Sequence, residues 1–266
     1  MNKFLIFFLL SVIPCSAQNF DYQLNCDWGK KPSPNLQVNG YTVKIDTSNQ
    51  FCKAIVIDPN QKTIFECKSS GIQIFAGTKF NTGGQPLAFI QSDGQPYRFF
   101  IISLGENSGL IQEIDNECGF WLQNNCEGRP RIWTCDGAFQ EEKELRDIYM
   151  GDLIVPNVEL DLRGNHIIDV TSEDKDCVDK NIAVVRKKLK DKDVRAFLEG
   201  TIKDDFHRGM VKGRILHIVL SYLYSGRENE AQNTLQQMWP PADKQRIWNW
   251  MIERRSKGIL SRLKKK

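Results

Sequence analysis

Acid–base or metal chemistry in this chain would have to come from three histidines and from its 33 aspartates and glutamates. None of the histidines, His166, His207 and His217, lies in a His-Glu-x-x-His array, so the usual zinc-hydrolase motif is absent. His207 and His217 fall on one predicted helix, about 280° apart around its axis at roughly 100° per residue. They cannot share a ligand or a proton, and we expect each histidine to be an exposed or core side chain.

Three acids alternate at Glu113, Asp115 and Glu117. On a strand they would face one side and could form a cation-binding row, although a solvated edge is the interpretation we favour. The chain has no Gly-x-Ser-x-Gly elbow and no glycine-rich phosphate loop, and Gly83-Gly84 is most simply a turn. A carboxylate pair for glycoside hydrolysis cannot be selected from sequence alone. We therefore predict no catalytic residue, no cofactor and no metal ion.

Cysteine is the remaining reactive side chain. One of the eight cysteines, Cys15, lies in an N-terminal leader, and seven follow it: Cys26, Cys52, Cys67, Cys118, Cys126, Cys135 and Cys177. An odd number leaves at least one cysteine free or bonded to another chain. We expect oxidised structural pairs, and Cys26 or Cys177, whichever stays reduced, is the candidate nucleophile.

One disulfide can be predicted from strand register. Residues 53–57 and 62–66 have strand patterns around Asp58-Pro59-Asn60-Gln61. If the loop centres on Pro59-Asn60, Cys52 and Cys67 lie directly opposite each other, at a separation that suits a disulfide. We predict that bridge, and a second one among Cys118, Cys126 and Cys135. Cys26 and Cys177 have no near neighbour and could join distant segments.

The N-terminal residues predict the oxidising environment. Met1-Asn2-Lys3 precedes an apolar run from Phe4 to Leu10, and the segment closes with Cys15-Ser16-Ala17. A charged start, an apolar stretch of about ten residues and small residues at the exit are the parts of a secretory signal peptide. We predict that residues 1–17 are removed after Ala17 and that the product is secreted or periplasmic. A lipoprotein acylated at Cys15 is the alternative, and Pro14 immediately before that cysteine argues against it.

Residues 18–170 are predicted to form an antiparallel β-rich domain, because short β-branched and aromatic runs alternate with Gly, Pro, Asn and Asp. Ser92-Asp93-Gly94-Gln95 is a strong hairpin signal. Short strands in this number indicate a sandwich or a propeller-blade-like sheet. The expected strands include 54–57, 63–67, 72–75, 87–91, 98–104, 110–114, 131–135, 158–162 and 167–170.

Residues 171–266 are predicted to form a helical domain, so the fold class is α+β. Apolar residues recur at spacings of three and four within 176–189 and 206–224, and further helices are expected at 191–200, 229–238 and 241–257. We expect the tail from Arg262 to Lys266 to fray.

Charge is divided unevenly between the two parts of the chain. Residues 18–185 contain 15 Lys and Arg against 24 Asp and Glu, whereas residues 186–266 contain 20 against 9. Such asymmetry is typical of separate structural units that attract each other. The alternative is a basic surface facing an anionic envelope surface or an acidic partner.

The last predicted helix mixes aromatic and cationic side chains. Its candidate interaction residues are Arg246, Trp248, Trp250, Arg254 and Arg255. Its apolar arc spans about 200°, which favours core packing over an exposed surface. An exported protein is also a poor nucleic-acid binder, so we expect no nucleic-acid partner.

Two segments resemble known repeat families. Residues 215–240, ILHIVLSYLYSGRENEAQNTLQQMWP, are similar to a tetratricopeptide helical hairpin, with Tyr222, Gly226, Ala231 and Leu235 at the aromatic, glycine, alanine and large-apolar positions. The resemblance implies a helix pair that packs on a neighbour and, more weakly, partner binding.

Residues 81–139, with NTGGQPLAFIQ, RFFIISL and GRPRIWTCDGAF, resemble a degenerate VCBS/FG-GAP-like β module. The resemblance implies a blade-like β unit. The family's calcium loop corresponds to residues 124–129, where the acidic ladder is missing and Arg129 intrudes, so no metal is implied.

Taken together, these patterns predict an exported, disulfide-bonded, non-catalytic binding protein of the bacterial periplasm or envelope, with a protein partner. A secreted hydrolase with an unfamiliar site, and an inhibitor or immunity-type protein that blocks another enzyme, are the alternatives. The sequence does not indicate the oligomeric state.

Overall fold

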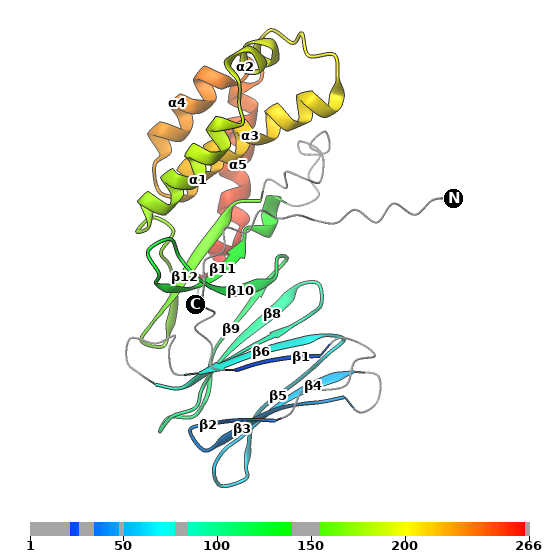
Figure 1. Ribbon diagram of the computed structural model, residues 1–266, viewed down its shortest axis with the longest axis vertical. Helices are drawn as coiled ribbons and strands as arrows, with labels where there is room; N and C mark the ends of the chain where they lie inside the picture. Colours follow the sequence, from blue (N-terminus) through cyan, green and yellow to red (C-terminus); the bar gives the residue numbers. More distant parts are fainter. Residues whose placement is uncertain (1–21, 27–34, 48–50, 78–84, 140–154, 264–266) are drawn as a thin grey trace, which may run out of the picture.

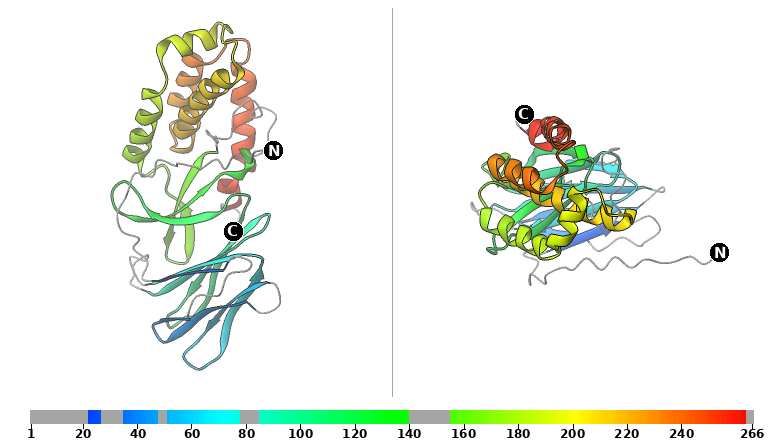
Figure 2. Two further views of the ribbon diagram at one scale, coloured as in Figure 1. Left: turned by 45° about the vertical axis from the view of Figure 1, so that its right-hand side comes forward. Right: turned by 90° about the horizontal axis from the view of Figure 1, so that it is seen from above.

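The computed structural model describes residues 22–26, 35–47, 51–77, 85–139 and 155–263. The fold is α+β, as predicted: antiparallel sheets are stacked toward one end of an elongated molecule and helices gather at the other (Figures 1 and 2). Within the described residues the sheets form no closed barrel and no propeller. The predicted leader with Cys15, and Gly83-Gly84, lie outside these residues.

Three sheets make up the β part, and we name them by position. The distal sheet has the order β2-β3-β4-β5, the central sheet β1-β6-β7-β8-β9, and the helix-side sheet β10-β11-β12-β13. Their strands are β1 (Tyr22–Cys26), β2 (Leu36–Val38), β3 (Tyr41–Asp46), β4 (Cys52–Ile57), β5 (Thr63–Ser69), β6 (Ile72–Gly77), β7 (Leu87–Ser92), β8 (Tyr97–Ser103), β9 (Gly109–Asn116), β10 (Phe120–Asn124), β11 (Pro130–Cys135), β12 (Asn157–Arg163) and β13 (His166–Asp169).

The central sheet is covered on both faces, which explains its continuous apolar sequence. Every residue of β7 is buried, whereas β3 and β4 alternate buried with partly exposed positions. Ala88 and Ile90 pack toward the distal sheet, while Phe89 joins the core that includes the helix-side sheet and the helices. Because both faces of these strands are buried, apolar residues follow one another without alternation from Leu87 to Ile90 in β7 and from Phe99 to Ile102 in β8.

The helices follow the last strand and pack on the same core as the helix-side sheet. They are α1 (Lys175–Lys187), α2 (Asp191–Leu198), α3 (Asp205–Tyr224), α4 (Glu228–Met238), α5 (Lys244–Lys257) and the short α6 (Ile259–Leu263). Gly226, with φ of +75°, ends α3, since a left-handed residue closes a helix most easily as glycine. The expectation that Arg262 frays is wrong, because it lies in α6 and donates to Glu117 Oε2 at 2.8 Å.

One buried carboxylate joins the β part to the helices. Asp136 follows β11 and precedes a short 3-10 helix, η2 (Gly137–Phe139). It accepts hydrogen bonds from the Tyr224 hydroxyl at 2.5 Å, from the amide of Ala138 at 3.1 Å and from the amide of Ile259 at 3.3 Å. A Cβ atom at Gly258 would lie 1.9 Å from Asp136 Oδ2, so only glycine fits there. Burial raises the pKa of Asp136, and its three donors partly offset that effect.

Three disulfides connect the layers, and the predicted Cys52–Cys67 bridge is wrong. The bridges are Cys26–Cys52, Cys118–Cys135 and Cys126–Cys177, with Cα–Cα distances of 6.2, 5.6 and 5.5 Å. The prediction that two of Cys118, Cys126 and Cys135 pair is confirmed, as is the joining of distant segments by Cys26 and Cys177. Neither of those two is therefore a candidate nucleophile, and Cys67 is the cysteine that forms no disulfide among the described residues.

The Cys52–Cys67 prediction fails because the β4–β5 turn sets a different strand register. Asp58 and Lys62 close the loop by backbone hydrogen bonding, and the register shifts at a bulge between Val56 and Ile57. Cys67 consequently lies opposite Ala54, and Cys52 lies opposite Ser69. Cys52 instead faces β1 across the two stacked sheets, where Cys26 meets it.

Removing the Asp136 acceptor should destabilise the whole fold. In Asp136→Ala the Tyr224 hydroxyl and the Ile259 amide lose their buried acceptor, so we expect the free energy of unfolding to fall by about 3 kcal/mol or more. Urea denaturation measures this change. Asp115→Ala, which removes an exposed carboxylate, should cost about 0.5 kcal/mol or less, and equal losses in the two variants would contradict the role of Asp136.

The Cys126–Cys177 bridge should stabilise the fold by constraining the unfolded chain across 51 residues. We expect the double variant Cys126→Ala/Cys177→Ala to lose about 2–4 kcal/mol in urea denaturation. The matched control is Cys67→Ala, which removes a sulfur that forms no disulfide and should cost clearly less. A loss for Cys67→Ala as large as for the double variant would show that the bridge assignment is wrong.

Candidate functional site

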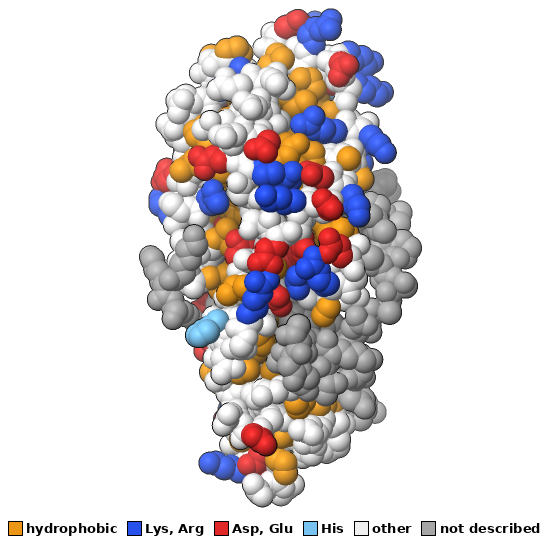
Figure 3. Space-filling view, turned by 90° about the vertical axis from the view of Figure 1, so that its left-hand side faces the viewer, with side chains coloured by type: hydrophobic (Ala, Val, Ile, Leu, Met, Phe, Trp, Pro, Cys, Tyr) orange, Lys and Arg blue, Asp and Glu red, His pale blue; other side chains and the backbone are white. Residues whose placement is uncertain are grey.

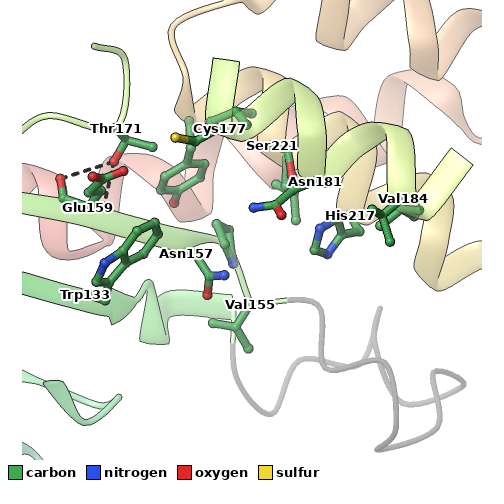
Figure 4. Close-up of a pocket in the computed structure, with 15 residues that line it drawn as sticks. Trp133, Val155, Asn157, Glu159, Thr171, Cys177, Asn181, Val184, His217 and Ser221 are labelled. Atoms are coloured by element: carbon green, nitrogen blue, oxygen red, sulfur yellow. Dashed lines mark hydrogen bonds between the residues drawn. The ribbon is translucent and has the colours of Figure 1, made fainter. Parts of the chain in front are cut away.

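A pocket of about 270 Å³ opens between the helix-side sheet and helices α1 and α3 (Figure 4). Strands β11 and β12 supply one wall and the two helices supply the other. The described lining residues are Trp133, Val155, Pro156, Asn157, Glu159, Thr171, Cys177, Val178, Asn181, Val184, Val185, His217, Leu220, Ser221 and Tyr224.

Secondary-structure periodicity places these side chains in the pocket. Trp133 and Glu159 are direct cross-strand partners, and Cys135 and Asn157 form the next pair. Their neighbours Thr134, Val158 and Leu160 are buried on the opposite face of the sheet, because successive side chains alternate. On α1 and α3 the lining positions recur every three or four residues, which is one face of a helix.

The pocket wall is apolar with neutral hydrogen-bonding groups. Val178, Val184 and Leu220 contribute apolar surface, while two amides, Asn157 and Asn181, lie on opposite walls (Figure 4). Ser221 adds a hydroxyl and His217 an imidazole. No Lys or Arg occurs among the described lining residues.

An aromatic ledge extends the pocket along the sheet. Trp121 on β10 lies directly opposite Trp133 on β11, so both indoles are on the face of the sheet that lines the pocket. Trp121 is 38% exposed. Trp133 is held in place by a hydrogen bond from its indole nitrogen to the carbonyl of Gln123 at 3.2 Å. We call this pair the Trp121–Trp133 ledge.

A buried ionic network lies behind the pocket floor. Arg131 is 6% exposed, and its guanidinium is 3.1 Å from Glu159 Oε1, 3.5 Å from Asp174 Oδ2 and 3.3 Å from Asp161 Oδ2. Asp174 also accepts from Asn125 at 2.8 Å and from Arg129 at 2.7 Å. Each charge in the network therefore has a partner, as burial demands.

Two titratable groups of the pocket have raised pKa values. Burial, together with the neighbouring Asp174 carboxylate, raises the pKa of Glu159 to about 8. Burial also acts to raise the pKa of Asp174, but hydrogen bonds from Glu159 and Asn125 and the charges of two arginines lower it overall. Burial and the Asp136 carboxylate raise the pKa of Tyr224. Glu159 and Tyr224 are thus both neutral near pH 7.

The candidate interaction residues lie on α5, where several of them pack against the core. Trp250 is buried and packs edge-on against Phe139 at 5.4 Å, so it is not an accessible contact residue. Trp248 packs partly against the same core, and the Arg255 guanidinium lies 5.8 Å from the Tyr224 ring centroid. Arg246 is exposed and pairs with Asp243 at 2.6 Å, and Arg254 is half-buried. The core-packing interpretation therefore fits α5 better than an interaction surface.

Of the three histidines, only His217 lines the pocket. His207 lies 3.4 Å from Asp193 through its Nε2 atom, and His166 is exposed at the β12–β13 hairpin. No pair of histidines comes together, as the helical spacing predicted.

The three alternating acids, on β9 and in the turn after it, form ion pairs with arginines. Glu113 accepts from Arg98 at 2.8 Å, Asp115 is 3.8 Å from the same guanidinium, and Glu117 pairs with Arg262. The described residues contain no group of three or more His, Cys, Asp and Glu side chains that could hold a metal ion.

Some ion pairs connect the acidic and basic parts of the sequence. Arg262 binds Glu117 at 2.8 Å and Arg227 binds Asp179 at 2.5 Å. On the face shown in Figure 3, cationic and anionic side chains lie side by side across the middle of the molecule. These contacts fit the interpretation that the two parts attract each other. A further anionic surface as partner stays a prediction.

The segments behind the two family resemblances adopt definite structures. Residues 215–240 include most of the helix pair α3–α4, with Ala231 and Leu235 buried between helices. Of residues 81–139, the described part from 85 to 139 is divided between two sheets, since β7–β9 belong to the central sheet and β10–β11 to the helix-side sheet. They therefore do not form one blade. In the loop at 124–129, Arg129 pairs with Asp174.

No protein-family model matches the chain, and no curated protein or solved structure is similar enough to count as a match. Among the described residues no helix combines the length and hydropathy of a membrane span. The function must therefore be argued from the pocket itself.

The pKa of Glu159 should govern how stability changes with pH. Folded Glu159 stays protonated up to about pH 8, whereas its ordinary value is 4.5, so the unfolded chain binds fewer protons between these values. The stability of the wild type therefore falls as pH rises through this window. Glu159→Gln is neutral at every pH. We therefore expect the difference in free energy of unfolding, variant minus wild type, to rise by at least about 1 kcal/mol as the pH rises from about 5 to about 8.5.

Urea denaturation at several pH values from about 5 to about 8.5 measures this difference. Glu66→Gln is the control, because a hydrogen bond and the charge of Lys53 lower the pKa of Glu66. The ionised Glu66 carboxylate stabilises the fold throughout the range above its ordinary pKa of 4.5. The free energy of unfolding of Glu66→Gln relative to wild type should therefore not rise between about pH 5 and 8.5. A flat difference for Glu159→Gln would mean that Glu159 is ionised in the folded protein.

Proposed function

We propose that this protein is an exported, non-catalytic binding protein that holds its ligand in the pocket between the helix-side sheet, α1 and α3. The observation that carries the proposal is the chemistry of the pocket wall. Two amides, an imidazole, a carboxyl group and the hydroxyls of Ser221, Thr171 and Tyr224 line a surface that also contains valines, a leucine and a fixed tryptophan. A few placed polar groups on an apolar wall are the usual composition of a ligand site.

Export is supported by the cysteines. Six of the described cysteines form three disulfides, which indicates an oxidising environment outside the cytoplasm. The leader-like pattern of residues 1–17 agrees with this environment. We place the protein in the bacterial periplasm or envelope on the style of that leader.

A secreted hydrolase is the second candidate, because Glu159 lines the pocket and its pKa of about 8 is that of a general acid. Two contacts favour binding over hydrolysis. The Glu159 carboxyl group is only 2% exposed and is engaged by Arg131 and Asp174. The Tyr224 hydroxyl donates to Asp136, which is not a lining residue. Neither group offers a free proton donor to a bound substrate.

Blocking the pocket tests the proposed function. Val184 lies at the rim and is 48% exposed, so Val184→Trp should fill the opening without disturbing the core. The matched control is Lys187→Trp, an exposed position on the same helix that does not line the pocket. We expect immobilised wild type and Lys187→Trp to retain one molecule or partner from an envelope extract, and Val184→Trp to retain at least tenfold less.

Mass spectrometry and electrophoresis would identify the retained material. Equal retention by Val184→Trp and by the control would refute a binding role for this pocket. The same extract should be unchanged after incubation with wild type. Turnover of an envelope peptide or glycan by wild type, lost in Glu159→Gln, would establish the hydrolase instead.

A further inference from the structure

We infer that the pocket and the Trp121–Trp133 ledge bind an uncharged carbohydrate, with one sugar ring in the pocket and a neighbouring ring on the ledge. The inference rests on the proposed function and specifies its ligand class. Four properties of the site carry it: its size, the two indoles, the neutral hydrogen-bonding groups and the position of the strands within the sheet.

The size of the pocket favours a single small ring. Pockets for drug-sized ligands usually measure about 300–1,000 Å³, and this one, at about 270 Å³, lies just below that range. A longer ligand must therefore continue outside it. The ledge begins at Trp133, which lines the pocket, and continues to Trp121 on the next strand.

The two indoles suit the apolar face of a sugar. Side chains of directly opposed residues in an antiparallel pair have Cβ atoms about 5 Å apart, so the Trp121 and Trp133 side chains start side by side on one face of the sheet. Large, rigid aromatic side chains lose little conformational entropy on binding. Trp133 is fixed further by its bond to Gln123, while the 38% exposure of Trp121 leaves a face for a ligand.

The polar groups of the pocket suit hydroxyl groups. An amide side chain both donates and accepts hydrogen bonds, as a sugar hydroxyl does, and Asn157 and Asn181 present two amides from opposite walls. The Ser221 hydroxyl also both donates and accepts hydrogen bonds. Glu159, the one acid among the described lining residues, is kept neutral by burial. A charged sugar would therefore find no opposite charge in the described wall.

The position of the strands argues against an extended peptide in the pocket. A peptide that adds to a sheet needs an open edge with unpaired backbone groups. Strands β11 and β12, which line the pocket, are paired on both sides, whereas β10, which carries Trp121, is an edge strand of the sheet. Within the pocket a ligand therefore contacts side chains, and pairing of a peptide with β10 is the alternative that the peptide comparator tests.

Calorimetry and tryptophan fluorescence with defined oligosaccharides test the inference on the full mature protein. Cellohexaose, chitohexaose and mannohexaose are the neutral probes, and oligogalacturonate and a proline-rich peptide are the comparators. We expect at least one neutral hexasaccharide to bind and quench fluorescence. Trp121→Ala and Asn181→Ala, both at exposed positions, should each weaken binding at least tenfold.

Phe51→Ala is the matched control, since Phe51 is 56% exposed but lies on the distal sheet side, away from the pocket. It should leave affinity unchanged. The inference would be overturned if no neutral glycan bound, either among the three hexasaccharides or on a broad glycan array, while the peptide or oligogalacturonate did bind. If Val184→Trp still abolished retention of a non-carbohydrate molecule, the proposed function would stand and only the ligand class would be wrong.

Discussion

The buried carboxylate of Asp136 is the contact on which the arrangement of the molecule depends. It follows the last residue of β11, accepts the hydroxyl of Tyr224 at the end of α3, and accepts the amide of Ile259 where α5 gives way to α6. A carboxylate in an apolar interior is tolerated only when its acceptor sites are filled. The three elements are therefore held in one relative position, and the two walls of the pocket, β11 and α3, are set by the same group.

The charged side chains near the pocket are paired with one another behind its floor. Arg131, Asp174 and their partners satisfy one another beneath the floor, so a ligand need not neutralise them. In the proposed site, the groups that a ligand would meet include amides, hydroxyls and aromatic faces. Interactions of this kind are individually modest, and their effect depends on being held rigidly before the ligand arrives. The Cys126–Cys177 disulfide supplies that rigidity by joining the β10–β11 turn to α1.

Features set by local sequence could be predicted, and features set by distant contacts could not. The β7–β8 hairpin follows from Asp93-Gly94, and α3 follows from its apolar spacing and from Gly226. The strands β1, β2, β3 and β10 lie within the predicted β-rich region but were not singled out individually. Cys52 was assigned to the wrong partner because one bulge in a nearby turn displaced the register. The pocket draws on β11, β12, α1 and α3, and its residues share no motif, although two tryptophans opposed across a hairpin were a visible signal.

The packing of Gly258 and Ile259 on Asp136 bears on the order in which the chain folds. The amide of Ile259 lies 123 positions along the sequence from the carboxylate to which it donates, and Arg262 lies 145 positions from Glu117, which it binds. During synthesis the earlier segments emerge first, so Asp136 lacks one of its donors until residue 259 has left the ribosome. The interior around Asp136 can therefore close only after nearly the whole chain has been synthesised, so this contact forms late in folding.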